Sequence, residues 1–172
     1  MTPSGPLLLA GGGHSHALLL RRWAMTPLLR PKRGVVLVNR HPTALYSGMV
    51  PGLIAEIYQQ DELSINLPHL CDRAGVAFVQ AEITGVDYLR QHLLLHKRPS
   101  LHFGVLSLDV GAVTRNSDNL SGVPIKPLEE ALHFLSLQDP EDPEPFRIVG
   151  AGAAGIEVAL ALRRRWPHRA LE

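Results

Sequence analysis

Two glycine-rich turns, each placed between an apolar run and a stretch with helical character, constrain the fold of this chain more than any other feature. The first turn follows the apolar run Leu7 to Ala10 and reads Gly11-Gly12-Gly13. The second follows Phe146 to Val149 and reads GAGAAG, from Gly150 to Gly155. The two turns begin about one domain length apart. This arrangement predicts two nucleotide-binding turns in two successive α/β units.

Each glycine of a G-x-G-x-x-G turn has its own physical role. The first permits the sharp bend from strand to helix, the second lets the backbone approach a pyrophosphate, and the third lets the helix pack closely on the strand. The N-terminus of the helix then offers N–H groups and partial positive charge to the phosphates. The second turn has all three glycines, which are Gly150, Gly152 and Gly155.

The first turn departs from this pattern at its third position. Gly11 and Gly13 meet the first two requirements, but His16 stands where the third glycine would be. Because this position governs packing more than phosphate contact, we expect His16 to push the helix slightly from the sheet or to turn its side chain outward. A single turn of this kind is weak evidence for a nucleotide site, since a tight strand–helix turn without a ligand can have the same sequence. Two such turns favour nucleotide sites.

The residues that follow the second predicted strand could also contact a nucleotide at the first turn, although they are not the usual ones. A dinucleotide fold usually has an acid there, on the ribose hydroxyls. Here Asn39 and Arg40 follow the β-branched run Val35 to Val38. The Asn39 amide can hydrogen-bond a hydroxyl, and Arg40 can stack on adenine or meet a phosphate. A solvated loop is the alternative for both residues.

The rest of the pattern predicts a mixed α/β fold. Strands at 7–10 and 35–38, joined through a helix at 14–23, make a βαβ unit with a parallel sheet. Residues 40–60 are interrupted by Gly48, Pro51 and Gly52 and are predicted to be irregular. Further along the chain, a short helix capped by Asn66 and ended by Gly75 precedes a strand at 76–80. Three further strands, at 83–88, 92–96 and 103–108, suggest an antiparallel meander.

The segment DPEDPEP, residues 139–145, has the composition of a linker. Its four acids and three prolines exclude a helix or a central strand. We therefore expect a first domain at 1–138, a linker at 139–145 that allows motion, and the strand, turn and helix of a second domain at 146–172. The last helix has an apolar surface that we expect to pack on the meander or on a second copy of the chain. Its residues are Ile156, Val158, Ala159, Leu160 and Leu162.

Composition excludes several classes of function. With 17 Lys and Arg against 16 Asp and Glu, the net charge of +1 gives no argument for nucleic acid. One cysteine, Cys71, excludes an internal disulfide framework, and a cytoplasmic setting is the default. No apolar run reaches the roughly 20 residues of a transmembrane helix. The histidine sets lack carboxylate or cysteine partners at ligand spacing, so no metal site is expected; these sets are His14 with His16, and His92 with His96 and His102.

The order of these features resembles the two-dinucleotide-binding flavoproteins of the pyridine nucleotide-disulfide oxidoreductase superfamily. The order runs from the first turn through Asn39-Arg40, the meander and LSLDVGA at 106–112 to the second turn. Within the superfamily the chain is similar to the type II NADH dehydrogenase branch. The stretches GGGHSHALLL and YSGMVPGLIA most resemble the FAD/NAD-binding domain found fused to selenide, water dikinase. The resemblance implies a Rossmann-like FAD-binding domain with a parallel sheet and an antiparallel β-meander, then the start of a Rossmann NAD(P)-binding domain.

The resemblance also implies two cofactors and their contacts. FAD would bind the first turn, and NADH or NADPH the second. The implied FAD contacts are Gly11, Gly13, Ser15 and His16 at the pyrophosphate, Asn39 and Arg40 near the adenosine, Glu82 and Ile83 beside the adenine, and Asp109, Val110 and Gly111 where the chain passes close to FAD. The family usually has Ala-Thr-Gly at this last segment, so Asp109 is a departure.

The stretch Tyr46 to Gly52, with Met49 and Pro51, would pass along the flavin ring. Disulfide reductases have two cysteines in that region and this chain has none, so electrons would leave the flavin directly to an external small-molecule acceptor. In related enzymes a glutamate two residues past the third glycine lies near the nicotinamide, which is Glu157 here. A helix-surface carboxylate is the alternative for Glu157.

These features predict an FAD-dependent NAD(P)H oxidoreductase. Few residues follow the second turn, so we expect an N-terminal portion of a longer flavoprotein. A nucleotide-binding module without turnover is the alternative.

Overall fold

The computed structural model describes residues 4–112 and 122–172. These residues fall into two compact units: 4–45 with 64–111, and 46–63 with 112 and 122–172. The first unit contains the first glycine turn and the second unit contains the other.

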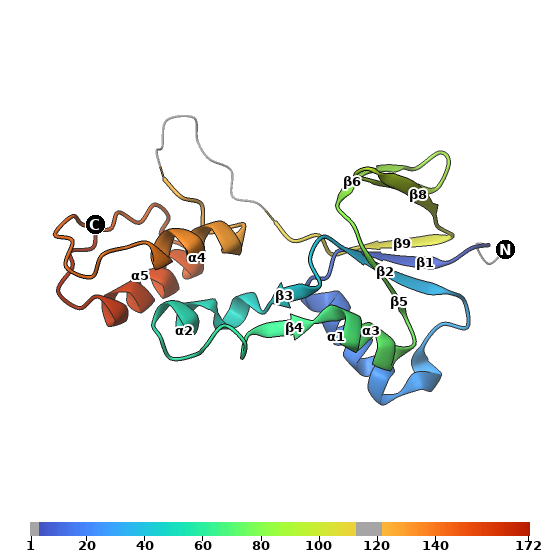
Figure 1. Cartoon of the computed structure of the whole chain (residues 1–172), viewed down its shortest axis with the longest axis horizontal. Helices are drawn as coiled ribbons and strands as arrows, with labels where there is room; N and C mark the ends of the chain where they lie inside the picture. The colour runs from blue at the N-terminus through green and yellow to red at the C-terminus, as the bar shows by residue number, and fades with distance from the viewer. Residues whose placement is uncertain (1–3, 113–121) are drawn as a thin grey trace. The chain divides into compact units, whose positions relative to one another are not determined.

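A four-stranded parallel sheet is the centre of the first unit (Figure 1). Its order is β5-β2-β1-β9, from Ala77–Gln80, Val35–Asn39, Leu7–Ala10 and Val105–Leu108. Leu7 of β1 pairs in register with Val35 on one side and with Val105 on the other. The continuous apolar runs of β1 and β2 suit strands that are covered on both faces. The predicted fold class, a Rossmann-like parallel sheet with additional antiparallel strands, is confirmed.

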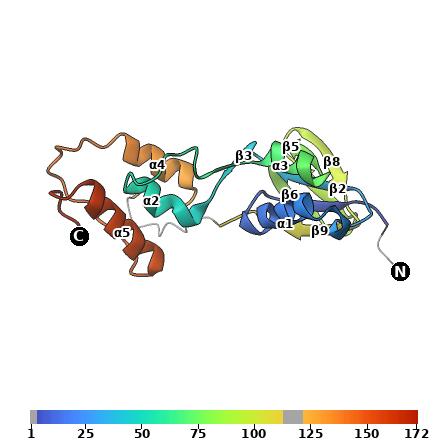
Figure 2. The same ribbon diagram turned by 90° about the horizontal axis from the view of Figure 1, so that it is seen from below.

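Alternate residues of β1 face two separate hydrophobic clusters. Leu9 packs with Leu20 and Trp23 of α1 (His14–Met25) and with α3 (Leu67–Ala74). Leu8 and Ala10 belong to the cluster on the other face. Figure 2 views the unit from the side of α1 and α3. A short 3₁₀ turn, η1 (Pro27–Leu29), connects α1 toward β2.

An antiparallel meander covers the second face of the sheet. It consists of β6 (Ile83–Asp87), β7 (His92–Leu95) and β8 (Arg98–His102). The prediction that 103–108 is the third strand of this meander was wrong, because Val105–Leu108 pairs in parallel with β1. The polar sequence RPSLH of β8 looks like a break, but its proline is tolerated because β8 is an edge strand.

The predicted capped helix is confirmed as α3. The Asn66 side chain accepts a hydrogen bond from the His69 amide at 2.9 Å, and Gly75 ends the helix with φ of +65°. Just before this helix, β4 (Ser64–Asn66) pairs antiparallel with β3 (Thr43–Leu45). This pair adds regular structure to a region that was predicted to be irregular.

The second unit is mostly helical. It contains η2 (Ser47–Met49), α2 (Val50–Ile54), α4 (Leu128–Ser136) and α5 (Ala153–Arg165). α5 packs against α2, a partner that the sequence did not suggest, and Arg165 forms a 3.1 Å ion pair with Glu56. Ala161 and Leu162 of α5 are buried, whereas Ile156 and Leu160 stay exposed. Self-association through this face remains a prediction.

The last residues of the chain run parallel to the residues before the second turn. The Phe146 amide donates to the Ala170 carbonyl at 3.0 Å, and the Ile148 amide donates to the Glu172 carbonyl at 2.8 Å. The second glycine turn and α5 therefore lie between two extended segments that pair in parallel. This is the connectivity of a βαβ unit, like that of the first turn.

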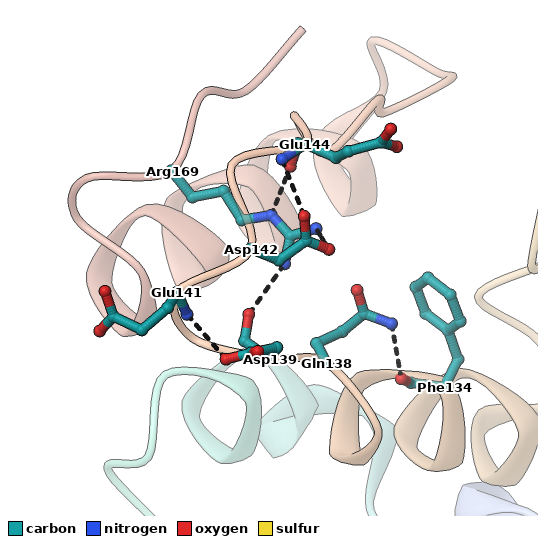
Figure 3. A network of polar contacts seen from close by, with 7 residues as sticks. All are labelled: Phe134, Gln138, Asp139, Glu141, Asp142, Glu144 and Arg169. Carbon is teal, nitrogen blue, oxygen red and sulfur yellow. Dashed lines mark hydrogen bonds and ion pairs between the residues drawn. The ribbon is translucent and has the colours of Figure 1, made fainter.

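Arg169 contacts the acidic segment at 139–145, which was predicted to be a linker. Arg169, which is buried, donates to the Glu144 carbonyl at 2.6 Å and to the Asp139 carbonyl at 3.4 Å, and pairs with Asp142 at 3.0 Å (Figure 3). Its guanidinium also lies 3.9 Å from the centre of the Phe146 ring. The prolines prevent regular structure, but one arginine side chain fixes the loop. The proposed domain boundary at this loop stays a prediction.

Candidate dinucleotide-binding turns

The first glycine turn is held by the neighbouring strand β2. The Gly11 amide donates to the Val38 carbonyl at 2.8 Å, and the Gly12 amide donates to Asn39 Oδ1 at 2.9 Å. Gly11 has φ of +92°, and a Cβ atom on it would overlap the Asp109 carbonyl. Glycine is required there for both reasons, the left-handed backbone and the close approach of β9.

Asp109, the departure from the family pattern, joins the end of β9 to the start of α1. Its amide donates to the Ala10 carbonyl at 2.8 Å, and its carbonyl accepts from the Gly13 amide at 3.2 Å. Its Oδ2 atom accepts from the His16 amide at 3.1 Å. α1 has no acidic residue in its own first turn, so Asp109 supplies the negative charge that stabilises a helix N-terminus.

His16 is buried, so of the two expected outcomes, a helix pushed slightly from the sheet or a side chain turned outward, the second does not occur. Only 3% of the residue is exposed. Its Nδ1 atom lies 2.7 Å from the Gly11 carbonyl and its Nε2 atom lies 2.9 Å from Ser107 Oγ. A carbonyl only accepts, so Nδ1 carries the proton, and in the neutral ring Nε2 accepts from the Ser107 hydroxyl. The imidazole therefore bridges β1, α1 and β9.

The second turn repeats the backbone of the first but differs at the third position. Gly13 and Gly152 cap their helices with closely similar dihedral angles, φ −66° and ψ 178° against φ −77° and ψ 174°. Gly150 has φ of +125°, in the same left-handed half of the map as Gly11. A Cβ atom on Gly155 would overlap the Gly150 carbonyl. The helix thus lies directly on the turn at the second site, whereas at the first site the His16 ring lies beside the corresponding carbonyl of Gly11.

Both turns leave their second helical position accessible to a ligand. Ser15 in α1 and Ala154 in α5 each follow the capping glycine by two residues, and both are exposed. Anions bind at such helix N-termini through backbone N–H groups and the helix dipole. A hollow of about 460 Å³ adjoins the second turn, lined by its three glycines and by residues such as Phe134 and Val158. Both turns thus have an exposed second helical position. At the first turn the Asp109 carboxylate already lies against Gly13 and accepts from the His16 amide, whereas Gly152 at the second turn has no such neighbour among the described residues.

The residues expected near the adenosine are partly brought together. Arg40 forms a 3.5 Å ion pair with Glu82, and both side chains are well exposed. Asn39 uses its oxygen for Gly12 and its nitrogen for the His41 carbonyl at 2.9 Å, which makes it a brace for the turn. Ile83 begins β6, directly after Glu82. Val110 is exposed and Gly111 has φ of +76°.

Three further predicted residues belong to the second unit. Met49 ends η2, Pro51 lies in α2, and Glu157 is exposed in α5. Their proposed places beside the flavin and the nicotinamide stay predictions.

The sequence did not single out Ser107. It lies inside the LSLDVGA stretch, as a polar residue within an apolar strand, and that pattern is the signal that could have identified it. Ser107 is half-buried, and its hydroxyl has a hydrogen-bond partner in His16 Nε2.

The single cysteine is poorly suited to redox chemistry. Cys71 is buried in the α1–α3 cluster, and burial raises the pKa of its thiol from the ordinary 9.0 to about 11. The reactive form of a cysteine is the thiolate, so this thiol is inert near neutral pH. Among residues 4–112 and 122–172, no three His, Cys, Asp or Glu side chains gather as a metal site, and no helix is long and apolar enough to cross a membrane.

The parallel sheet, the meander and the two glycine turns define a Rossmann-like dinucleotide-binding fold. No family model matches the chain. The chain is 31% identical over 148 residues to a demethylphylloquinone reductase of Synechocystis sp., and this match covers 78% of the chain and 37% of the reductase. The chain therefore spans little more than a third of that relative.

Solved structures with this fold include several pyridine nucleotide oxidoreductases. The water-forming NADH oxidase from Lactobacillus brevis, bound to NADH, matches with a TM-score of 0.72 and 14% identity, over 98% of this chain and 39% of the oxidase. The NADH:rubredoxin oxidoreductase from Clostridium acetobutylicum matches with a TM-score of 0.69 and 17% identity, over 97% of this chain and 43% of that protein. At these identities the likeness establishes the fold.

Proposed function

We propose that the chain supplies the FAD-binding region, and the first part of the NAD(P)-binding region, of a flavin-dependent NAD(P)H oxidoreductase. The observation that carries this proposal is the pair of glycine turns, which share one backbone geometry and each lie in a βαβ connection. The names of the curated relative and of the structural neighbours, which are reductases and oxidases, support it.

FAD binds at the first turn in this proposal. The start of α1 around Ser15 would hold its pyrophosphate. The Gly13 amide donates to the Asp109 carbonyl, and the Asp109 carboxylate occupies the space that a Cβ atom on Gly13 would need, so Gly13 would admit the pyrophosphate once that carboxylate moves aside. Asn39 holds the turn through its hydrogen bond to the Gly12 amide. The exposed side chains of Arg40 and Glu82 would contact the adenosine. His16 and Asp109 act on the backbone of the turn, so we regard them as positioning residues.

NADH or NADPH binds at the second turn. Gly152 would admit the pyrophosphate, because no atom of the described residues lies within 4 Å of a Cβ atom built on it. Glu157, exposed one turn into α5, would approach the nicotinamide. FAD, when bound, supplies an acceptor for hydride and a donor to the next electron carrier.

Electron transfer out of the flavin uses no thiol of these 172 residues. Cys71 has no cysteine partner in the sequence, and its buried thiol resists ionisation. The electrons would therefore pass directly to an external small-molecule acceptor. The stretch with Met49 and Pro51 would line the flavin without contributing a redox group.

Two finer assignments belong to the same proposal. The stretches GGGHSHALLL and YSGMVPGLIA support a relationship to the FAD/NAD-binding domain fused to selenide, water dikinase. The sequence, with its single buried cysteine, favours a cytoplasmic setting.

The proposal is tested by titrating the chain with FAD while flavin fluorescence is measured. We expect quenching on binding, and then bleaching of the flavin absorbance when NADH is added without oxygen. Ser15→Asp should weaken FAD binding about tenfold or more, because its charge repels the pyrophosphate at short range. An acid in the first turn favours the helix itself, so the fold is preserved.

Ser15→Asn is the matched neutral control and should bind FAD nearly as the unchanged chain does. Gly13→Val is a poorer probe, because a Cβ atom there would overlap the Asp109 carboxylate as well as the ligand. FAD binding that is unaffected by Ser15→Asp would refute the first site. Bound flavin that NADH fails to reduce would favour a nucleotide-binding module without turnover.

A further inference from the structure

Three large apolar side chains project into solvent where α1 ends. Met25 is 71% exposed, Leu28 is 96% exposed and Leu29 is 51% exposed. They lie within five positions of each other, on the last residue of α1 and on η1. We call these three residues the apolar tip. Single exposed apolar residues are ordinary, but a cluster of them marks a contact surface.

Cationic residues precede and follow the apolar tip along the chain. Arg21 and Arg22 precede it on α1 and are exposed, and Lys32 follows it and is exposed as well. Arg30 and Arg33, close to it in the sequence, are half-buried. The neighbouring helix α3 has one carboxylate, Asp72, which is followed directly by Arg73.

The sequence shows the same imbalance on a larger scale. No Asp or Glu precedes Glu56, whereas six Lys and Arg residues do. The near-neutral net charge of the chain therefore conceals a strongly basic N-terminal stretch. A charge asymmetry of this kind indicates a polyanionic partner, either a nucleic acid or a membrane surface.

The apolar tip lies at the opposite edge of the sheet from the first glycine turn. α1 begins at the turn, where the parallel strands end, and reaches the tip at its other end, just before β2 begins. A helix of 12 residues separates the two by roughly 18 Å. Contact at the tip would therefore leave the nucleotide site open.

We propose that the apolar tip inserts into the surface of an anionic lipid bilayer, with the flanking cations on the lipid headgroups. Leu28, almost fully exposed, decides between the two polyanions, because an aliphatic side chain gains nothing from a phosphate backbone but gains free energy in acyl chains. Exposed Arg21, Arg22 and Lys32 can reach headgroup phosphates, and their apolar stems can lie along the interface. The proposal is independent of the cofactors.

The test is co-sedimentation of the 172-residue chain with vesicles of phosphatidylcholine containing phosphatidylglycerol, and with vesicles of phosphatidylcholine alone. We expect binding to the anionic vesicles that weakens as salt is added. Leu28→Ser with Leu29→Ser should lower the partition coefficient about tenfold or more. Arg21→Gln with Arg22→Gln should lower it about 25-fold, at about 1 kcal/mol per cation.

Leu89→Ser is the matched control. Leu89 is 98% exposed in the turn between β6 and β7, so the same change there should leave vesicle binding intact. Circular dichroism confirms that each variant is folded. Equal losses from Leu89→Ser and from the tip variant would overturn the proposal, as would failure of the unchanged chain to bind anionic vesicles.

Insertion itself is measured with an environment-sensitive fluorophore on Leu28→Cys. The native Cys71 is buried and its thiol is poorly ionised, so labelling is selective. A blue shift on adding anionic vesicles supports insertion. A blue shift without vesicles that grows with protein concentration would assign the tip to a second copy and overturn the proposal, and binding of duplex DNA in preference to vesicles would overturn it too.

Discussion

At the scale of single residues, His16 shows how one substitution in a glycine turn is accommodated. The sequence identified position 16 as a packing position, and of the two alternatives it left open, the outward side chain did not occur. The ring is retained inside because two polar groups satisfy it, the Gly11 carbonyl and the Ser107 hydroxyl. The partner Ser107 comes from a strand about 90 residues away, and local sequence patterns do not reveal such a contact.

His16→Gly restores the full fingerprint but should destabilise the chain. It leaves the Gly11 carbonyl without its donor, opens a void and adds a glycine to a helix, at a combined cost of about 2–4 kcal/mol. His16→Asn retains a donor near the carbonyl and should cost less. Urea unfolding measures both. If His16→Gly were as stable as the unchanged chain, α1 would have closed onto β1 as α5 does at Gly155, and the bridging role would be refuted.

At the scale of elements, the sequence predicted what local signals determine. The Asn66 cap, the Gly75 stop and the run Val35 to Val38 each depend on neighbouring residues, and each was confirmed. The assignment of Val105–Leu108 failed because strand pairing is non-local. The apolar strand β9 pairs with β1, and the polar strand β8 pairs with β7 as the third strand of the meander. The contacts of the acidic loop at 139–145 with Arg169, far along the chain, could not be predicted for the same reason.

Replacing Arg169 should therefore release the acidic loop. Arg169→Met removes the donors to Asp139, Asp142 and Glu144, so we expect hydrogen exchange at the Glu144 and Phe146 amides to accelerate about tenfold or more. Arg147→Met is the control, because its ion pair with Glu172 is exposed. Equal acceleration in the two variants would mean that Arg169 has no special part in fixing the loop.

At the scale of the whole molecule, the assignment of two ligands is based on the two glycine turns. They have the same strand–glycine–helix geometry, yet they differ at the third position and in their neighbours. The first is bridged by His16 and joined to β9 by Asp109, and the second lies beside an apolar hollow. These differences support two different ligands. The sequence predicted both turns because the glycine pattern is local, whereas the side chains around each turn depend on the tertiary fold.

A crossed binding measurement tests this central claim most directly. Ser15 and Ala154 hold the same helical position in the two turns, so Ser15→Asp and Ala154→Asp place the same charge at each. FAD and NADH are titrated separately against both variants and the unchanged chain. The account predicts that Ser15→Asp weakens FAD about tenfold or more and spares NADH, and that Ala154→Asp does the reverse. Equal weakening of both ligands by one substitution, or no effect from either, would contradict it.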